Sequence, residues 1–199
     1  MSHKSWFFKR PVMIHPIYAY GHVVLRKPAA EIPRDYPGLK NLIDDLYETM
    51  YHASGVGLAA PQIGQSLRIF VTDGESFSEE DPSVANFKKV FINPVILEEY
   101  GDEWLFNEGC LSIPKIREDV ERPSWVRVQY YDPHWNLNEE VFTGIAARII
   151  QHETDHLDGI LFVDHLPPIR RKLLQNDLKA ISQGHVKTSY KMVFPNNKK

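Results

Sequence analysis

One short segment of the chain could bind a metal ion. Gln151-His152-Glu153-Thr154-Asp155-His156 contains the pattern His-Glu-x-x-His. On a helix, side chains four residues apart lie on the same face, so His152 and His156 can bind one ion together. Glu153 then lies beside the ion, where the general base of a metal-dependent hydrolase is needed. Two histidines alone leave the site short of protein ligands, so a third must come from elsewhere.

The third ligand is sought among the remaining side chains that bind metals. No glutamate follows Glu153, which excludes the His₂Glu set of thermolysin-type peptidases. The metzincin pattern needs a histidine where Phe162 stands. Asp164 and His165 remain as downstream alternatives. The stronger candidate is Cys110, the only cysteine, because a thiolate binds divalent ions tightly and is deprotonated by them.

A glycine-rich segment, Gly55-Val56-Gly57-Leu58-Ala59-Ala60-Pro61-Gln62, resembles the dinucleotide-binding pattern G-x-G-x-x-A. That pattern must follow a strand and open a helix, whereas this segment follows an expected helix and runs into Pro61. We therefore reject a dinucleotide site. Gln62 is a polar side chain in an apolar stretch, so it needs a hydrogen-bond partner.

The spacing of apolar residues predicts the elements that must position these groups. We expect helices over 37–53, 143–157 and 169–183, and strands over 67–72, 90–97, 126–131 and 139–142. The second helix is apolar nearly all round, which is typical of a buried helix, and the third is amphipathic. Because strands and helices do not alternate, we expect an α+β fold. Antiparallel β-sheets would pack around a buried central helix carrying the His-Glu-x-x-His element.

Length and composition fit one soluble domain. The chain has 199 residues, a formal charge of −3 and one cysteine, which excludes an intramolecular disulfide and fits a reducing compartment. It shows neither the apolar segment of a membrane helix nor that of a signal peptide, so we expect a cytoplasmic protein without direct nucleic-acid recognition. We expect an N-terminal extension over 1–12 that is a candidate for disorder, because Met13 could be a second start. A single catalytic domain over 13–187 and a polar, frayed tail over 188–199 would follow.

Three segments in order resemble the motifs of peptide deformylases: residues 55–62, Glu108-Gly109-Cys110-Leu111-Ser112, and residues 151–156. The similarity continues through Ile113-Pro114 and 157–162, and covers about 17–162. It implies removal of the N-formyl group from the initiator methionine of nascent chains. It also implies one divalent ion, commonly Fe²⁺ in the cell with Zn²⁺, Ni²⁺ or Co²⁺ as substitutes.

The resemblance also assigns roles to individual residues. Glu153 would be the general acid and base, and Gln62 with the backbone N–H of Leu111 would stabilise the oxyanion. The metal ligands, with a water molecule in the fourth position, would be Cys110, His152 and His156.

Substrate contacts are expected close to these groups. The methionine side chain would enter a pocket lined by apolar residues of the buried helix, such as Ile145 and Ile149. The extended substrate backbone would pair with Val56 and Gly57 as an added strand.

Two further expectations concern charged side chains. Asp155 would point away from the metal and pair with Arg122 or Arg117, the alternative being a solvated aspartate. The basic face of the third helix would contact the ribosome or simply be solvated; it consists of Arg170, Arg171, Lys172 and Lys179.

Two other functions remain open from the sequence. In a zinc endopeptidase, Asp164 or His165 would be the third ligand and Cys110 would be structural. In a copper electron carrier with a His₂Cys site, a methionine such as Met50 or Met192 would be the axial ligand.

Overall fold

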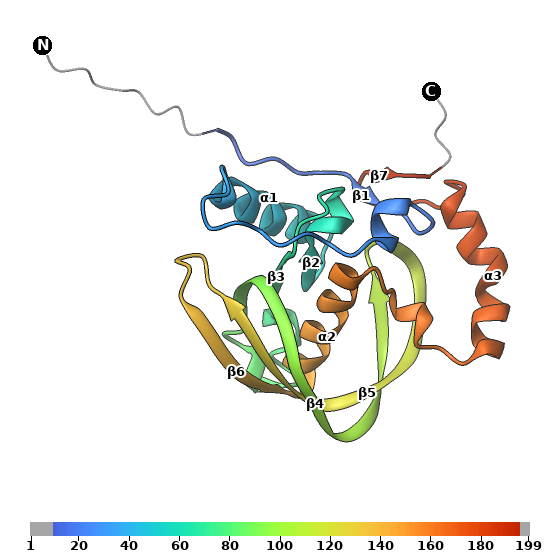
Figure 1. The fold of residues 1–199 in the computed structure, drawn as a ribbon. Coiled ribbons are helices and arrows are strands. Elements are labelled where there is room, and N and C mark those ends of the chain that lie inside the picture. Colours follow the sequence, from blue (N-terminus) through green and yellow to red (C-terminus); the bar gives the residue numbers. More distant parts are fainter. Residues whose placement is uncertain (1–9, 196–199) are drawn as a thin grey trace, which may run out of the picture.

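The computed structural model describes residues 10–195, so most of the expected N-terminal extension and the last four residues lie outside the described part. Within that part, one five-stranded sheet has the order β2-β3-β4-β5-β6, with every neighbouring pair antiparallel (Figure 1). Its strands are Gly57–Ala59 (β2), Ile69–Asp73 (β3), Lys88–Cys110 (β4), Ile113–Tyr131 (β5) and Leu137–Thr143 (β6).

Three α-helices pack around this sheet: Leu39–His52 (α1), Gly144–Asp158 (α2) and Pro168–Ser182 (α3). Helix α2 follows β6 directly and lies in the middle of the molecule, between the long strands and the β2–β3 edge (Figure 1). It ends at Gly159, whose φ of 76° is in the left-handed region that glycine adopts without strain. The expected α+β fold with a buried central helix is confirmed, and all three helices begin and end within about two residues of the expected positions.

The core explains why α2 is apolar on nearly every side. One cluster of buried residues joins α2 to the inner face of the sheet, and its members include Phe70, Phe91, Val126, Phe142 and Ile150. A second cluster lies between α1 and the other face of β3, around Leu46, Met50 and Val71. The sheet and the neighbouring helix therefore fix the position of α2 from several directions, as a helix that carries a functional site requires.

Strands β4 and β5 are much longer than expected, because they continue past residue 97 and before residue 126 into a hairpin arm. The arm ends in a two-residue turn, Leu111-Ser112, with Cys110 opposite Ile113. In β5, residues 114–122 do alternate between buried and exposed positions, but the buried positions include the charged residues Glu118 and Arg122. The expectation failed here because an inward-facing charge breaks the apolar alternation that marks a strand.

The C-terminal segment also differs from the expected frayed tail. Met192–Val193 (β7) pairs in parallel with Ile17–Tyr18 (β1), so that one strand near each end of the described chain lies beside the other (Figure 1). Tyr190 and Met192 pack against the buried cluster of α1. The described part of the tail is thus held by pairing with a strand distant in sequence, which no local pattern could indicate. Among residues 10–195, no helix is both long and apolar enough to cross a membrane.

Candidate active site

The side chains that the sequence predicts as metal ligands lie together. One potential ligand atom from each of Cys110, His152 and His156 falls within 4.8 Å of the other two. Cys110 is the last residue of β4, and the histidines lie one turn apart on α2. Cys110 Sγ lies 3.3 Å from His156 Nε2. Such spacing suits one ion bound by a thiolate and two imidazoles.

The surroundings of Cys110 favour its thiolate form. Burial raises the pKa of this thiol, but the charge of His156 and the hydrogen bonds and charge of the two histidines outweigh it and lower the pKa to about 5. His156 faces the thiolate through its Nε2, which leaves that nitrogen available as a ligand atom. The donor set is therefore one that fits a divalent cation.

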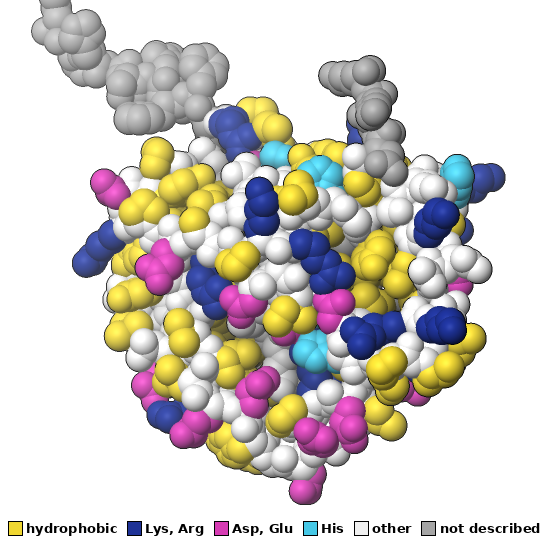
Figure 2. Space-filling view, turned by 45° about the vertical axis from the view of Figure 1, so that its right-hand side comes forward, with side chains coloured by type: hydrophobic (Ala, Val, Ile, Leu, Met, Phe, Trp, Pro, Cys, Tyr) yellow, Lys and Arg dark blue, Asp and Glu magenta, His cyan; other side chains and the backbone are white. Residues whose placement is uncertain are grey.

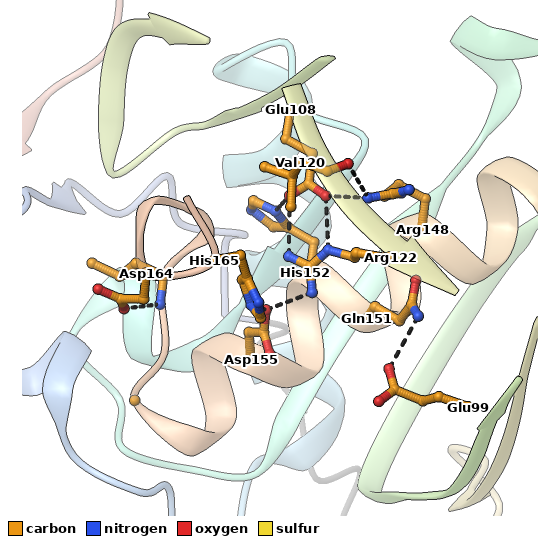
Figure 3. Close-up of polar contacts among 12 residues, drawn as sticks. Glu99, Glu108, Val120, Arg122, Arg148, Gln151, His152, Asp155, Asp164 and His165 are labelled. Carbon is orange, nitrogen blue, oxygen red and sulfur yellow. Dashed lines mark hydrogen bonds and ion pairs between the residues drawn. The ribbon is translucent and has the colours of Figure 1, made fainter. Parts of the chain in front are cut away.

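Glu108, on β4, orients His152. Its Oε2 accepts a 2.8 Å hydrogen bond from His152 Nδ1, which leaves Nε2 of that ring to face the metal centre (Figure 3). Burial raises the pKa of Glu108, but the hydrogen bond and charge of His152, together with those of Arg122, hold it far below the ordinary value of 4.5. Glu108 is therefore an ionised buried carboxylate that keeps the His152 ring in a single orientation.

Two buried arginines neutralise Glu108. Arg122, on β5, donates from Nε to Glu108 Oε1 at 2.8 Å, and Arg148, on α2, donates to the same oxygen at 2.9 Å. The guanidinium of Arg148 also donates to the carbonyl oxygens of Val120 and Trp104. The network thus joins β4, β5 and α2 next to the candidate ligand His152 (Figure 3).

Asp155 extends this network toward the surface. It accepts a 2.7 Å hydrogen bond from Arg122 and lies 2.7 Å from His165 Nε2, so the expected ion pair with Arg122 is confirmed (Figure 3). Arg117, the other candidate partner, instead donates to the side-chain and backbone oxygens of Asn107.

The alternative third ligands are engaged elsewhere. The Asp164 carboxylate pairs with Arg26 and accepts a 2.8 Å hydrogen bond from the Leu161 N–H. His165 is held by Asp155. Neither belongs to the potential metal cluster found among the described residues. Met50, one of the two candidate axial ligands for copper, is fully buried in the α1 core cluster.

Glu153 has the opposite surroundings to Glu108. It is buried, its Oε2 has no hydrogen-bond partner among the described residues, and burial raises its pKa to about 7 against the lowering effect of His156 and His152. Its carboxylate lies directly against β2, where a Cβ on residue 57 would come within 2.5 Å of Oε1. Gly57 is thus needed for close approach, and Glu153 can exchange a proton near neutral pH.

Gln62 and Leu111 lie next to Cys110, one of the candidate metal ligands. Gln62 is buried, and its Oε1 accepts a 2.8 Å hydrogen bond from the Ala59 N–H. That bond turns its amide nitrogen toward Cys110 Sγ, at 3.5 Å, and Ser112 Oγ, at 3.4 Å. Leu111 occupies the first position of the β4–β5 turn, immediately after Cys110.

A cavity of about 720 Å³ opens onto these groups. Of the expected substrate-contacting residues, Val56, Gly57 and Ile149 line it, together with Phe77 and Phe106. Ile145 does not line it and packs instead in the core cluster. Since Ile145 precedes Glu153 by eight residues, it lies about 12 Å further along the helix axis, too far from the reacting groups.

Sequence reasoning missed several residues of the site. Glu108 receives no role from the sequence analysis. An acidic residue two positions before a candidate metal-binding cysteine could nevertheless have indicated a partner for one of the histidines. Arg148 was hidden because it stands in an apolar helix. Tyr190 and the other C-terminal residues that line the cavity, Lys187, Thr188 and Ser189, carry no local signal at all.

Comparisons with known proteins identify the family of this chain. A sequence model of the polypeptide deformylase family matches residues 14–172. The peptide deformylase of Christiangramia forsetii is 48% identical over 194 residues, which cover 94% of this chain and 99% of that protein. The enzyme of Cytophaga hutchinsonii is 50% identical over 183 residues, covering 92% and 98%.

The fold agrees as well. A crystal structure of Plasmodium falciparum peptide deformylase matches with a TM-score of 0.76 and 34% identity, over 85% of this chain and 96% of that chain. The chain therefore belongs to the peptide deformylase family, and is a hydrolase that removes the N-formyl group from newly synthesised proteins.

Proposed function

We propose that Cys110, His152 and His156 hold one divalent ion and that Glu153 moves the proton in the deformylation reaction. The observation that carries this proposal is the convergence of three ligand atoms within 4.8 Å beside a buried carboxylate. When bound, the ion would lower the pKa of a water molecule and polarise the formyl group. The thiolate–imidazole donor set suits Fe²⁺, which we propose as the ion in the cell, and equally Zn²⁺, Ni²⁺ or Co²⁺.

Glu153 would serve as both general base and general acid. In its ionised form it accepts a proton from the attacking water molecule as the oxygen bonds to the formyl carbon. It then returns this proton to the amine nitrogen while the C–N bond breaks, so that formate and a free amine leave. A pKa raised to about 7 supports both steps, because the carboxyl group can then gain and lose a proton at working pH.

Gln62 and the Leu111 N–H would stabilise the negative charge that develops on the formyl oxygen. The side-chain amide of Gln62 is already fixed through its oxygen by Ala59, so its nitrogen needs no reorganisation during the reaction. A donor of this kind contributes roughly 10²–10³ in turnover.

Substrate would bind along the open edge of β2. Strand β2 pairs with β3 on one side only and is the edge strand of the sheet. Val56 and Gly57 line the cavity there, which supports their pairing with an extended substrate backbone. The methionine side chain would contact Ile149, Phe77 and Phe106, which supply an apolar wall of the cavity.

Helix α3 is the proposed contact with the ribosome, which would place the enzyme in the cytoplasm. Arg170 is not free for this role, because it pairs with Glu118 at 2.7 Å. Arg171, Lys172 and Lys179 are exposed, and none has a carboxylate partner within the described residues. Ile169 and Leu173 are also exposed on this helix. Figure 2, with the right-hand side of Figure 1 turned forward, shows basic and hydrophobic side chains close together at the right of the molecule.

The role of Glu153 predicts that Glu153→Gln keeps the metal but loses at least about 10²-fold in kcat, because the amide cannot accept the proton. Formate release from a formyl-Met peptide and metal content measure the two effects. In the wild type, the rate should fall as pH drops below the pKa of Glu153, since the protonated carboxyl is no longer a base. Glu103→Gln, on the exposed part of β4, is the control. Full activity in Glu153→Gln would sink the assignment.

The network around Glu108 predicts that Glu108→Gln lowers the free energy of unfolding of the metal-free protein by about 3–5 kcal/mol at pH 7, because two buried arginines lose their anion. Metal affinity should fall about 10–100-fold. Since the pKa of Glu108 is lowered in the folded state, the stability difference should be complete above about pH 4.5 and shrink on acidification. Urea unfolding across this range checks it, with the exposed Glu121→Gln as control. Equal unfolding curves at pH 7 would contradict the prediction.

The ribosome contact predicts that reversing the charges of Arg171, Lys172 and Lys179 to glutamate weakens cosedimentation with ribosomes. Activity on a free formyl-Met peptide should not change, because the helix surface lies away from the catalytic groups. The matched control reverses the charges of three exposed residues elsewhere, Lys27, Arg34 and Lys40. Cosedimentation that is equal for the two triple variants would dispose of a specific role for α3.

A further inference from the structure

The turn that carries Leu111 is held from outside by two hydrogen bonds. Leu111 and Ser112 connect β4 to β5, and the carbonyl oxygen of each accepts a bond from a distant part of the chain. The Tyr190 hydroxyl donates to Leu111 O at 2.8 Å. The Tyr20 N–H donates to Ser112 O at 2.8 Å. Successive carbonyl groups of a two-residue turn are thus both fixed.

Both donors lie next to the small parallel sheet of β1 and β7. Tyr20 follows β1 by two residues, and Tyr190 precedes β7 by two residues. The two strands are joined by hydrogen bonds from Ile17 N to Lys191 O and from Ala19 N to Val193 O, both 2.9 Å long. The sheet therefore carries the two tyrosines to the turn together, as one unit.

Tyr190 is also part of the cavity itself. It lines the cavity with Lys187, Thr188 and Ser189, so the C-terminal segment forms one wall of the active site. It is half-buried, and burial together with the negative charge of Cys110 raises its pKa to about 12, which keeps the hydroxyl a donor. Residues 187–190 lie beyond the stretch that matches the family sequence model.

We propose that Tyr190 is a positioning residue, which holds the Leu111 peptide so that its N–H faces the formyl oxygen of the substrate. Leu111 N and Leu111 O flank the same Cα, and each residue has only two soft backbone dihedrals. A hydrogen bond on the carbonyl side therefore restricts the direction of the N–H on the other side. The inference rests on the role of Leu111 given under the proposed function.

The test compares Tyr190→Phe with Tyr47→Phe in the metal-loaded full-length protein. Tyr47 is also half-buried, and its hydroxyl donates to a backbone oxygen, Lys89 O, at 2.9 Å, so the control loses the same kind of bond from α1. We expect Tyr190→Phe to lower kcat about five-fold, the size of one neutral hydrogen bond, with KM and metal content unchanged. Amide hydrogen exchange at Leu111 and Ser112 should become faster in Tyr190→Phe only.

An unchanged kcat in Tyr190→Phe, an equal loss in Tyr47→Phe, or a loss that follows metal content would each overturn the role of Tyr190. Unchanged exchange at Leu111 and Ser112 would overturn it as well. The exchange measurement needs no turnover, so it remains decisive if the wild-type protein fails to release formate, which would instead refute the proposed function.

Discussion

The carboxylate of Glu108 is buried among Arg122, Arg148 and His152, and the arrangement of the Cys110, His152 and His156 cluster depends on this contact. The four side chains come from β4, β5 and α2, so one anion joins three elements, of which β4 and α2 carry the candidate metal ligands. Removing an anion and two guanidinium groups from water is costly, and the cost is recovered only when their hydrogen bonds are well formed. Any rotation of α2 against the hairpin would break several of these bonds together. The network therefore keeps the two histidines in register with Cys110, at the end of the neighbouring strand.

Glu108 and Glu153 show how surroundings give one residue type two roles. Both are buried near the same histidines, but arginines contact only Glu108, and its pKa is depressed. Glu153 lies against the backbone of Gly57, one of its oxygens has no hydrogen-bond partner within residues 10–195, and its pKa is raised to about 7. A pair of titratable groups whose pKa values are moved in opposite directions is typical of catalytic sites. The Glu108 carboxylate stays charged near neutral pH, while the Glu153 carboxyl group, the proposed general base, can gain and lose a proton there.

The sequence predicted the parts of the site that depend on local spacing, and missed those that depend on distant partners. The ligand face of α2 follows from helical periodicity, so His152, Glu153 and His156 were predictable, as was the class of fold. The outer hairpin was missed because its inward-facing residues Glu118 and Arg122 are charged, and their partners lie elsewhere in the chain. Ile145 is apolar, as a residue lining the expected pocket should be, but the rise of the helix places it too far from Glu153 to line the cavity. The β1–β7 sheet was missed for a topological reason, since two-residue strands at opposite ends of a chain have no periodicity to detect.

Helix α2 also sets the distance between Glu153, the proposed general base, and Ile149, the proposed contact of the substrate's first side chain. Ile149 precedes Glu153 by four residues, which is one helical turn, or about 6 Å along the axis. Both side chains line the cavity, so the apolar wall begins one turn from the Glu153 carboxylate. The close approach of β2, permitted by Gly57, brings a strand edge to the same place. In the proposed binding mode, a substrate on that edge presents its first side chain to Ile149 and its blocked amine to Glu153 at the same time. Because helix and strand are both rigid, this spacing is fixed before the substrate arrives.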